Sequence, residues 1–251
     1  MFTEHNDAFT LLKRNGKFLL YQTMLEPWPD KPYPDNLDNF KRVLAIRHSD
    51  DLHSWTPQEV FLRPDAQDPP ETEFYLMKAF PYDPGYLGII MKYFGDPAMP
   101  NKHSAILKHE LITSLDGVHW ERPWRETDLG FWPYADPVEH QGKTKFVIWK
   151  DNGMNTVAYG KHRLVGAVAE EPGSFEIPDF MLGVKGLILN VDARGGSVQV
   201  EVLRDGAVVG TGLVQDLDGL EVPMPLGTVQ PGPCSLRVAL RHARLFQISG
   251  R

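Results

Sequence analysis

The chain has 251 residues, a net charge of −7 and a single cysteine, Cys234. This length can bury a core without disulfides or metals, and one cysteine excludes an intramolecular disulfide, so we expect Cys234 to be inert packing. The lack of a basic block argues against a nucleic-acid partner. No apolar run approaches the roughly 20 residues that a membrane span needs.

Charge and tryptophan are distributed unevenly along the chain. Residues 179–251 hold seven acidic and seven basic residues, so residues 1–178 carry the whole net charge and all six tryptophans. This contrast predicts two domains, 1–178 and 179–251. Acidic and aromatic residues together are typical of sugar binding, because carboxylates bond to hydroxyls and aromatic faces pack on C–H groups.

The first predicted element is a hairpin over residues 7–22 with a two-residue turn at Asn15-Gly16. A proline-rich loop over residues 26–39 follows, in which prolines exclude helix and strand interior. A loop of this length in a compact domain is usually functional, and its aromatic residues predict a lid or rim. Trp28 and Tyr33 in this loop are therefore candidates for stacking on a sugar.

A repeated turn follows some of the predicted strands. Ser49–Trp55 and Ser114–Trp120 share the spacing S-x-D-x-x-x-W, and Ala169–Phe175 is a weaker third copy. Ser and Asp side chains in such turns bond to nearby backbone N–H groups. We expect Trp55 and Trp120 to fasten the following segments to the core. The copies begin at residues 49, 114 and 169, and strands that repeat at such a spacing indicate propeller blades.

Short strands fill most of the remaining sequence, and no segment predicts a helix of ten residues. After a strand at 42–47 and its partner at 60–62, the second unit has strands at 73–80, 86–94 and 106–113. The third unit has strands at 135–139, 144–149, 157–159 and 163–168. From residue 186 alternating strands with Gly turns predict a β-sandwich, with strands at 187–193, 197–203, 207–214, 236–240 and 244–248.

This layout resembles the five-bladed propeller glycoside hydrolases of the clan of families 32 and 43. It is most similar to a group of bacterial proteins related to family 32, in which a sandwich follows the propeller. The turn Ser-Leu-Asp-Gly-Val-His-Trp at 114–120, the segment 163–168 and the strands at 187–202 carry the likeness, which covers nearly the whole chain. The resemblance implies an all-β fold, with an incomplete propeller of about three blades before the sandwich.

The resemblance also implies a set of carboxylates at equivalent blade positions. Asp7 matches the acid that orients the sugar, Glu73 matches the general acid, and Asp136 begins the next unit. Glycosidic cleavage needs an acid and a second carboxylate as base or nucleophile. In this registration the blade with the family's base would precede Met1.

Three explanations for the missing blade and its base stay open. The chain is a truncated product, a reduced relative that closes its ring as a homo-oligomer, or a protein whose base has moved to Asp136 or to a loop acid such as Asp35. The N-terminus shows no signal peptide. As it stands the chain is therefore expected in the cytoplasm, or outside it if residues are missing.

The expected function is glycoside hydrolysis of an oligo- or polysaccharide without a cofactor, and the alternative is a non-catalytic carbohydrate-binding or interaction module. A third hypothesis is a glycoside phosphorylase, in which Arg42, Lys78 or Lys102 would bind phosphate. Trp132 and Tyr134 lie in loops and join the candidates for sugar stacking. The histidines lack metal-ligand spacing, so we expect no metal site.

Overall fold

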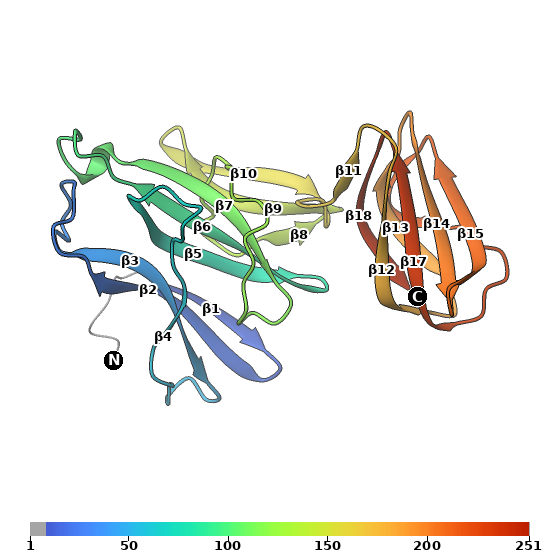
Figure 1. The fold of residues 1–251 in the computed structure, drawn as a ribbon, viewed down its shortest axis with the longest axis horizontal. Coiled ribbons are helices and arrows are strands. Elements are labelled where there is room, and N and C mark those ends of the chain that lie inside the picture. Colours follow the sequence, from blue (N-terminus) through green and yellow to red (C-terminus); the bar gives the residue numbers. More distant parts are fainter. Residues whose placement is uncertain (1–8, 251) are drawn as a thin grey trace. The chain divides into compact units, whose positions relative to one another are not determined.

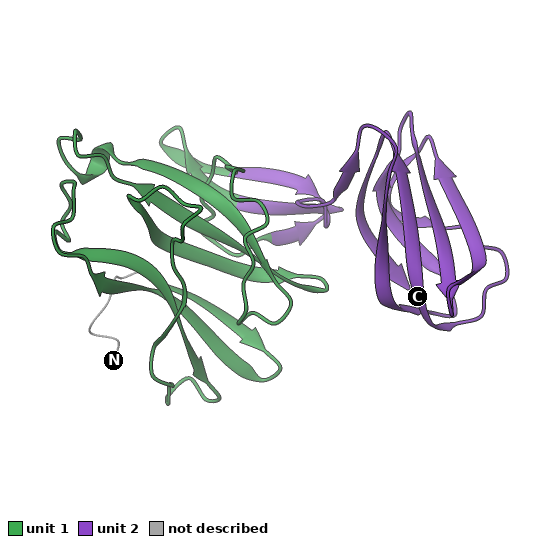
Figure 2. Ribbon diagram, viewed as in Figure 1, with its two compact units in different colours: residues 1–137, 147–155 green, residues 138–146, 156–251 purple. Residues whose placement is uncertain are grey.

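The computed structural model describes residues 9–250, which form β-strands and one short 3₁₀ helix (Figure 1). The prediction of an all-β protein is confirmed. No helix within this range is long and apolar enough to cross a membrane. The chain divides into two compact units, which are described separately (Figure 2). The first comprises residues 1–137 and 147–155, and the second comprises residues 138–146 and 156–251.

The first sheet is an antiparallel meander of four strands in the order β1-β2-β3-β4. Its strands are β1 (Phe9–Arg14), β2 (Lys17–Pro27), β3 (Phe40–Ser49) and β4 (Glu59–Leu62). Asn15 and Gly16 join β1 to β2 with positive φ angles of 47° and 81°, as the predicted turn requires. The loop predicted from its prolines joins β2 to β3.

The second sheet has the order β5-β6-β7 and packs on the first. Its strands are β5 (Thr72–Tyr82), β6 (Gly85–Phe94) and β7 (Ile106–Ser114), with the 3₁₀ helix η1 (Lys102–Ser104) between β6 and β7. Apolar side chains from both sheets form one core, which includes Leu12, Tyr21, Leu44, Phe74, Met77, Ile90 and Ile112. Buried hydrogen bonds join the sheets as well: Thr10 Oγ1 donates to the Met77 carbonyl, and Tyr21 Oη donates to the Gly117 carbonyl.

The repeated turn has the same hydrogen bonds in its first two copies. Ser114 Oγ accepts the N–H of Gly117 at 2.8 Å, and Trp120 Nε1 donates to the Gly117 carbonyl at 3.1 Å. Ser49 Oγ accepts the N–H of Leu52 in the same way. Trp120 packs against the core and against Tyr21, with ring centroids 5.8 Å apart, so its predicted role as a core contact is confirmed.

The third sheet has the order β10-β9-β8, and the division between the two units passes through it. Its strands are β8 (Val138–His140), β9 (Lys143–Lys150) and β10 (Gly153–Gly160). The strand expected at 163–168 does not join this sheet. Arg163 instead donates to Asn190 Oδ1 at 2.7 Å and pairs with Asp218 at 2.7 Å, which draws this segment to the C-terminal strands.

The C-terminal strands form two four-stranded sheets, with the orders β11-β18-β13-β16 and β12-β17-β14-β15. The strands are β11 (Ala167–Ala169), β12 (Gly173–Leu182), β13 (Leu187–Asp192), β14 (Ser197–Arg204), β15 (Ala207–Gln215), β16 (Asp218–Pro223), β17 (Gly232–Arg241) and β18 (Ala243–Gly250). Side chains from both sheets share a single core, including Leu189, Val191, Val200, Val238 and Leu245. This is the packing expected for a sandwich.

Two details of the C-terminal part differ from the sequence prediction. The third turn copy, 169–175, is not a blade turn: it leads from β11, which pairs with β18, into β12, which pairs with β17. Its small-acidic-aromatic pattern is a general turn signal that does not distinguish one sheet type from another. The C-terminal sheets therefore include residues from 167 on, ahead of the boundary expected at 178/179. The number of blades stays a prediction.

Candidate functional site

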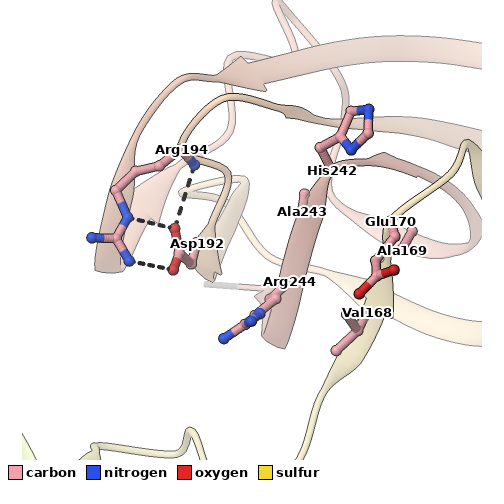
Figure 3. Close-up of a pocket in the computed structure, with 8 residues that line it drawn as sticks. All are labelled: Val168, Ala169, Glu170, Asp192, Arg194, His242, Ala243 and Arg244. Carbon is pink, nitrogen blue, oxygen red and sulfur yellow. Dashed lines mark hydrogen bonds and ion pairs between the residues drawn. The ribbon is translucent and has the colours of Figure 1, made fainter.

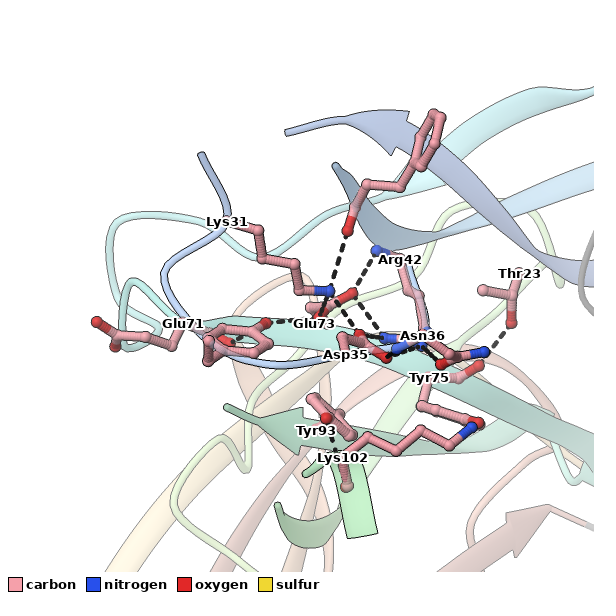
Figure 4. Close-up of polar contacts among 12 residues, drawn as sticks. Thr23, Lys31, Asp35, Asn36, Arg42, Glu71, Glu73, Tyr75, Tyr93 and Lys102 are labelled. Carbon is pink, nitrogen blue, oxygen red and sulfur yellow. Dashed lines mark hydrogen bonds and ion pairs between the residues drawn. The ribbon is translucent and has the colours of Figure 1, made fainter. Parts of the chain in front are cut away.

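The carboxylate predicted as the general acid lies in a buried cluster of charged residues. Glu73, the second residue of β5, has a side chain 0% exposed, and so do Lys31 and Asp35 from the β2–β3 loop. Arg42 of β3 completes the cluster and is equally buried. Figure 4 shows these four side chains converging, with Tyr75, Tyr93 and Lys102 beside them. A buried charge is tolerated only when it is paired, and here two acids meet two bases.

Four donors occupy the two carboxylate oxygens of Glu73. Oε1 accepts from Tyr33 Oη at 2.5 Å and lies 2.6 Å from Lys31 Nζ. Oε2 accepts from the backbone N–H of Arg42 at 2.7 Å and from its Nη1 at 3.0 Å. Strand β4 pairs with β3 only at residues 44–46, so it does not reach Arg42, whose backbone N–H bonds to Glu73 instead. Glu73 is thus held as a fully bonded carboxylate.

Asp35 binds the same two bases as Glu73. Its carboxylate accepts from Arg42 Nη1 at 2.7 Å and Nη2 at 3.0 Å, and Lys31 Nζ lies 2.6 Å from Oδ2. Burial by itself would raise the pKa of Asp35, but the hydrogen bonds from Arg42 and Lys31 outweigh it and lower the pKa from 3.8 to about 2. Asp35 is therefore an anion at neutral pH.

Tyrosine rings surround the arginine of this cluster. The guanidinium carbon of Arg42 lies 4.7 Å from the ring centroid of Tyr75 and 5.3 Å from that of Tyr93. The two rings stack at 5.8 Å. Tyr75 takes this position because the register between β5 and β6 shifts at this residue, and a β-bulge re-aims the side chain that it adds.

A cavity of about 230 Å³ lies against this pair of tyrosines. Its walls are Tyr75, Met91, Tyr93, Lys102, His103, Ala105 and Leu107. Burial first, and the nearby Asp35 charge second, raise the pKa of Tyr93 to about 12, so its hydroxyl stays protonated and donates to the Lys102 carbonyl at 3.4 Å. The cavity thus combines aromatic faces with polar groups, as ligand sites do.

The other predicted site residues lie in different places. Asp7 is outside the described residues 9–250. Asp136 pairs with Lys78 Nζ at 2.5 Å, and its side chain is 68% exposed. It belongs to no contact of the Glu73 cluster. Of the three phosphate-binding candidates, Arg42 and Lys78 are therefore both engaged with carboxylates.

The four aromatic residues that were predicted to stack on a sugar also lie in different places. Tyr33 is 4% exposed and packs between Trp28 and Tyr93, so it seals the cluster and presents no face to a ligand. Trp28 lies under Lys31 and Lys41, with Lys41 Nζ 4.9 Å from a ring centroid. Trp132 packs on His109 and Tyr134 is exposed, and neither lines the cavity beside Tyr75.

Sequence analysis missed Lys31 as an ion partner and the two tyrosines of the cavity. One signal was available: a glutamate at the start of a strand as apolar as 74–80 must be buried with a cation. The sequence does not say which cation, because the partners lie 31 and 42 positions from Glu73 on other elements.

A second buried ion cluster lies on the same sheet. Arg122 donates to both oxygens of Glu110 at 2.7 Å and to both oxygens of Asp68 at 2.6 Å. Lys92 Nζ lies 2.9 Å from Glu110. The guanidinium of Arg122 also lies over the ring of Phe74, at 4.8 Å. No residue of this cluster lines the cavity beside Tyr75.

The C-terminal unit has a polar cavity of about 340 Å³ (Figure 3). Arg194 donates to both oxygens of Asp192, at 2.8 Å and 2.6 Å, and these bonds lower the pKa of Asp192 to about 2. The charges of Asp192 and Arg194 neutralise each other, and no phenylalanine, tyrosine or tryptophan lines this cavity. In the same unit burial raises the pKa of the Cys234 thiol, which suits an unreactive residue.

No protein-family model matches the chain, and no curated protein matches it. Among solved structures, it is similar to a family 43 arabinoxylan arabinofuranohydrolase from Bacillus subtilis, in complex with cellotetraose (10% identity, TM-score 0.32, 99% of this chain and 55% of that chain). It is also similar to exo-β-1,3-galactanases from Clostridium thermocellum (11%, 0.34, 91% and 48%) and from Phanerochaete chrysosporium (11%, 0.25, 98% and 57%). The chain spans about half the length of these enzymes. At these TM-scores the similarity decides neither the fold nor the activity of this chain.

Proposed function

We propose that the protein recognises a carbohydrate at the cavity beside Tyr75 and Tyr93. The observation that carries this proposal is the pair of stacked tyrosines in the cavity wall, with Lys102 and His103 in the same wall. Aromatic faces pack on the C–H faces of sugar rings, and ammonium and imidazole groups bond to hydroxyls. The buried ion cluster behind the tyrosines holds Arg42 against their rings, which keeps the wall in place.

Protein groups occupy both carboxylate oxygens of Glu73, which favours carbohydrate binding over glycosidic cleavage as the function. A general acid must hold a proton and reach the leaving oxygen to within hydrogen-bond distance. Glu73 instead accepts from four donors and is 0% exposed. With Lys31, Arg42 and Tyr33 bonded to it, Glu73 holds the side chain of Arg42 in position.

Glycoside hydrolysis is the second candidate, and one distance favours it. Glu73 Oε1 and Asp35 Oδ2 each lie 2.6 Å from Lys31 Nζ, so these oxygens are at most about 5.2 Å apart, which is no farther than the roughly 5–5.5 Å between the carboxyl groups of retaining glycosidases. Asp35 would then supply the second carboxylate. This chemistry requires the β2–β3 loop to withdraw Lys31 and Tyr33 from Glu73.

A binding screen tests the first proposal. We expect the full chain to bind members of a panel of acidic and neutral oligosaccharides in calorimetry, and Tyr75→Ala to weaken this binding about tenfold, since stacking on an aromatic ring contributes about 1 kcal/mol or more. Tyr134→Ala is the matched control, because Tyr134 is 63% exposed and lies outside the cavity. Loss of binding in Tyr134→Ala alone would place the site elsewhere.

An activity assay tests the second candidate. If the protein is a glycosidase, it releases the chromophore from at least one aryl glycoside, and Glu73→Gln and Asp35→Asn each abolish release while circular dichroism shows a retained fold. Release by wild type that persists in both variants would exclude this carboxylate pair. Binding without any release supports a non-catalytic carbohydrate-binding protein.

A further inference from the structure

The charges around the cavity are uneven, and this bears on the chemistry of the ligand. Of the seven residues that line it, Lys102 and His103 are basic and none is acidic, although the whole chain has a net charge of −7. Behind the tyrosines, the carboxylates of Glu73 and Asp35 are matched by the cations of Lys31 and Arg42. The cluster therefore adds no net charge, and the charge of Lys102 is not offset by an acidic residue in the cavity lining.

Lys102 is held in place through its backbone. It begins the short helix η1, where Asn101 caps the turn by accepting from the His103 N–H at 3.0 Å. The Lys102 carbonyl accepts from Tyr93, so the helix is fastened to the tyrosine wall. Within residues 9–250, no carboxylate pairs with Lys102 Nζ, whereas Lys31, Lys78 and Lys92 are all paired.

We propose that the ligand of this cavity is an anionic saccharide, whose carboxylate or sulfate ester binds Lys102 while a sugar ring packs on Tyr75. This inference rests on the proposed carbohydrate function and adds the charge of the ligand. A volume of about 230 Å³ is below the ~300–1,000 Å³ of pockets for drug-sized ligands, so the cavity holds one ring of a longer chain. Lys102 recognises the anion as a point charge, without the fixed geometry that an arginine imposes.

Three trisaccharide probes separate the possibilities in calorimetry with the full chain. They are trigalacturonic acid, its neutral methyl ester and a sulfated galactotriose. We expect an anionic probe to bind about tenfold more tightly than the neutral ester, because a hydrogen bond to a charged group contributes about 1.5 kcal/mol or more. The two anionic probes distinguish a carboxylate ligand from a sulfate ester. The preference should shrink as salt is added, since Lys102 is partly exposed.

Lys102→Met tests whether this residue carries the preference, because methionine keeps an apolar stem and removes the charge. We expect the anionic and neutral probes to bind equally to this variant. Lys108→Met is the control: Lys108 lies on the neighbouring strand β7, over the ring of Phe94, and does not line the cavity. It should retain the preference.

The outcomes separate this inference from the proposed function. Equal binding of all three probes by wild type overturns the anionic ligand. A preference that survives in Lys102→Met overturns the assignment of the anion to Lys102. Either result leaves carbohydrate binding standing. If neither the three probes nor any saccharide of the wider panel binds, both the anionic ligand and the proposed carbohydrate function are overturned. A preference lost in Lys102→Met and kept in Lys108→Met supports the inference.

Discussion

Two buried ion clusters in the N-terminal unit use the same residue types in different surroundings. Around Glu110, one arginine spans two carboxylates with four short hydrogen bonds. Around Glu73, a lysine and an arginine are shared by two carboxylates, and three of these four residues come from a loop and the strand that follows it. In the Glu73 cluster the guanidinium of Arg42 lies over the rings of Tyr75 and Tyr93, which line the cavity described above.

A buried carboxylate is not by itself evidence of catalysis. Glu110 is as buried as Glu73, at 0% exposed, and its contacts indicate a structural role. What distinguishes Glu73 is its neighbours: a cavity, two tyrosines and a loop that supplies two of its partners. Function is therefore inferred from the surroundings of the carboxylate.

The largest expected effect is on stability, in the Glu110 cluster. Arg122→Met leaves Glu110 and Asp68 buried without their shared guanidinium, and removing one partner of a buried ion pair costs about 3–5 kcal/mol. We expect a loss near 5 kcal/mol in the free energy of unfolding, measured with urea. Saccharide affinity of the folded fraction should be unchanged. If Arg122→Met folds normally but no longer binds saccharide, the Glu110 cluster would matter for binding as well, and the two clusters would not differ in role.

A smaller loss of stability is expected in the Glu73 cluster, together with a loss of binding. Glu73→Gln costs about 3 kcal/mol, because Asp35 still pairs with both cations and glutamine keeps an oxygen acceptor. Arg42 loses part of its bracing against Tyr75 and Tyr93, so saccharide affinity falls about tenfold, or about 1.4 kcal/mol. Urea unfolding and calorimetry on the same preparation give both values. Unchanged affinity would show that this cluster is only structural.

The smallest effect is a pH dependence that belongs to Asp35. Its pKa is lowered from 3.8 to about 2 in the folded protein, so its charged form stabilises the fold above pH 3.8. That contribution is lost as the pH falls from 3.8 to about 2. The stability difference between wild type and Asp35→Asn should therefore be constant above about pH 5 and shrink below about pH 4. A difference that stays constant down to pH 2 would contradict the assigned ion pairs.

Local signals in the sequence predicted much of the fold. Asn15-Gly16 and the two S-x-D-x-x-x-W turns were found because turn chemistry acts over a few residues. Strand β12 was missed because Pro178 and Asp179 interrupt it at a register shift between Ile177 and Phe180. Strand β16 was missed because its short, partly exposed sequence DGLEVP has no clear alternation.

The candidate site was less predictable, because its partners are distant in sequence. Glu73 and the β2–β3 loop were each predicted to matter, but the sequence did not bring them together. Tyr33 was expected to face a sugar and instead donates to Glu73. The side chain of a loop residue points where tertiary contacts hold it, and no periodic pattern reports those contacts.

The hydrogen bond from Tyr21 to the Gly117 carbonyl spans 96 positions of the chain. Its donor leaves the ribosome long before its acceptor, and the core that surrounds Tyr21 also draws on Phe74, Ile90 and Ile112. The first sheet therefore cannot complete its packing during synthesis until the second has been made. Contacts of this separation slow folding, because a long loop must close before they form. Until the second sheet is made, the apolar faces of the N-terminal strands lack their partners, and transiently exposed surface of this kind favours aggregation.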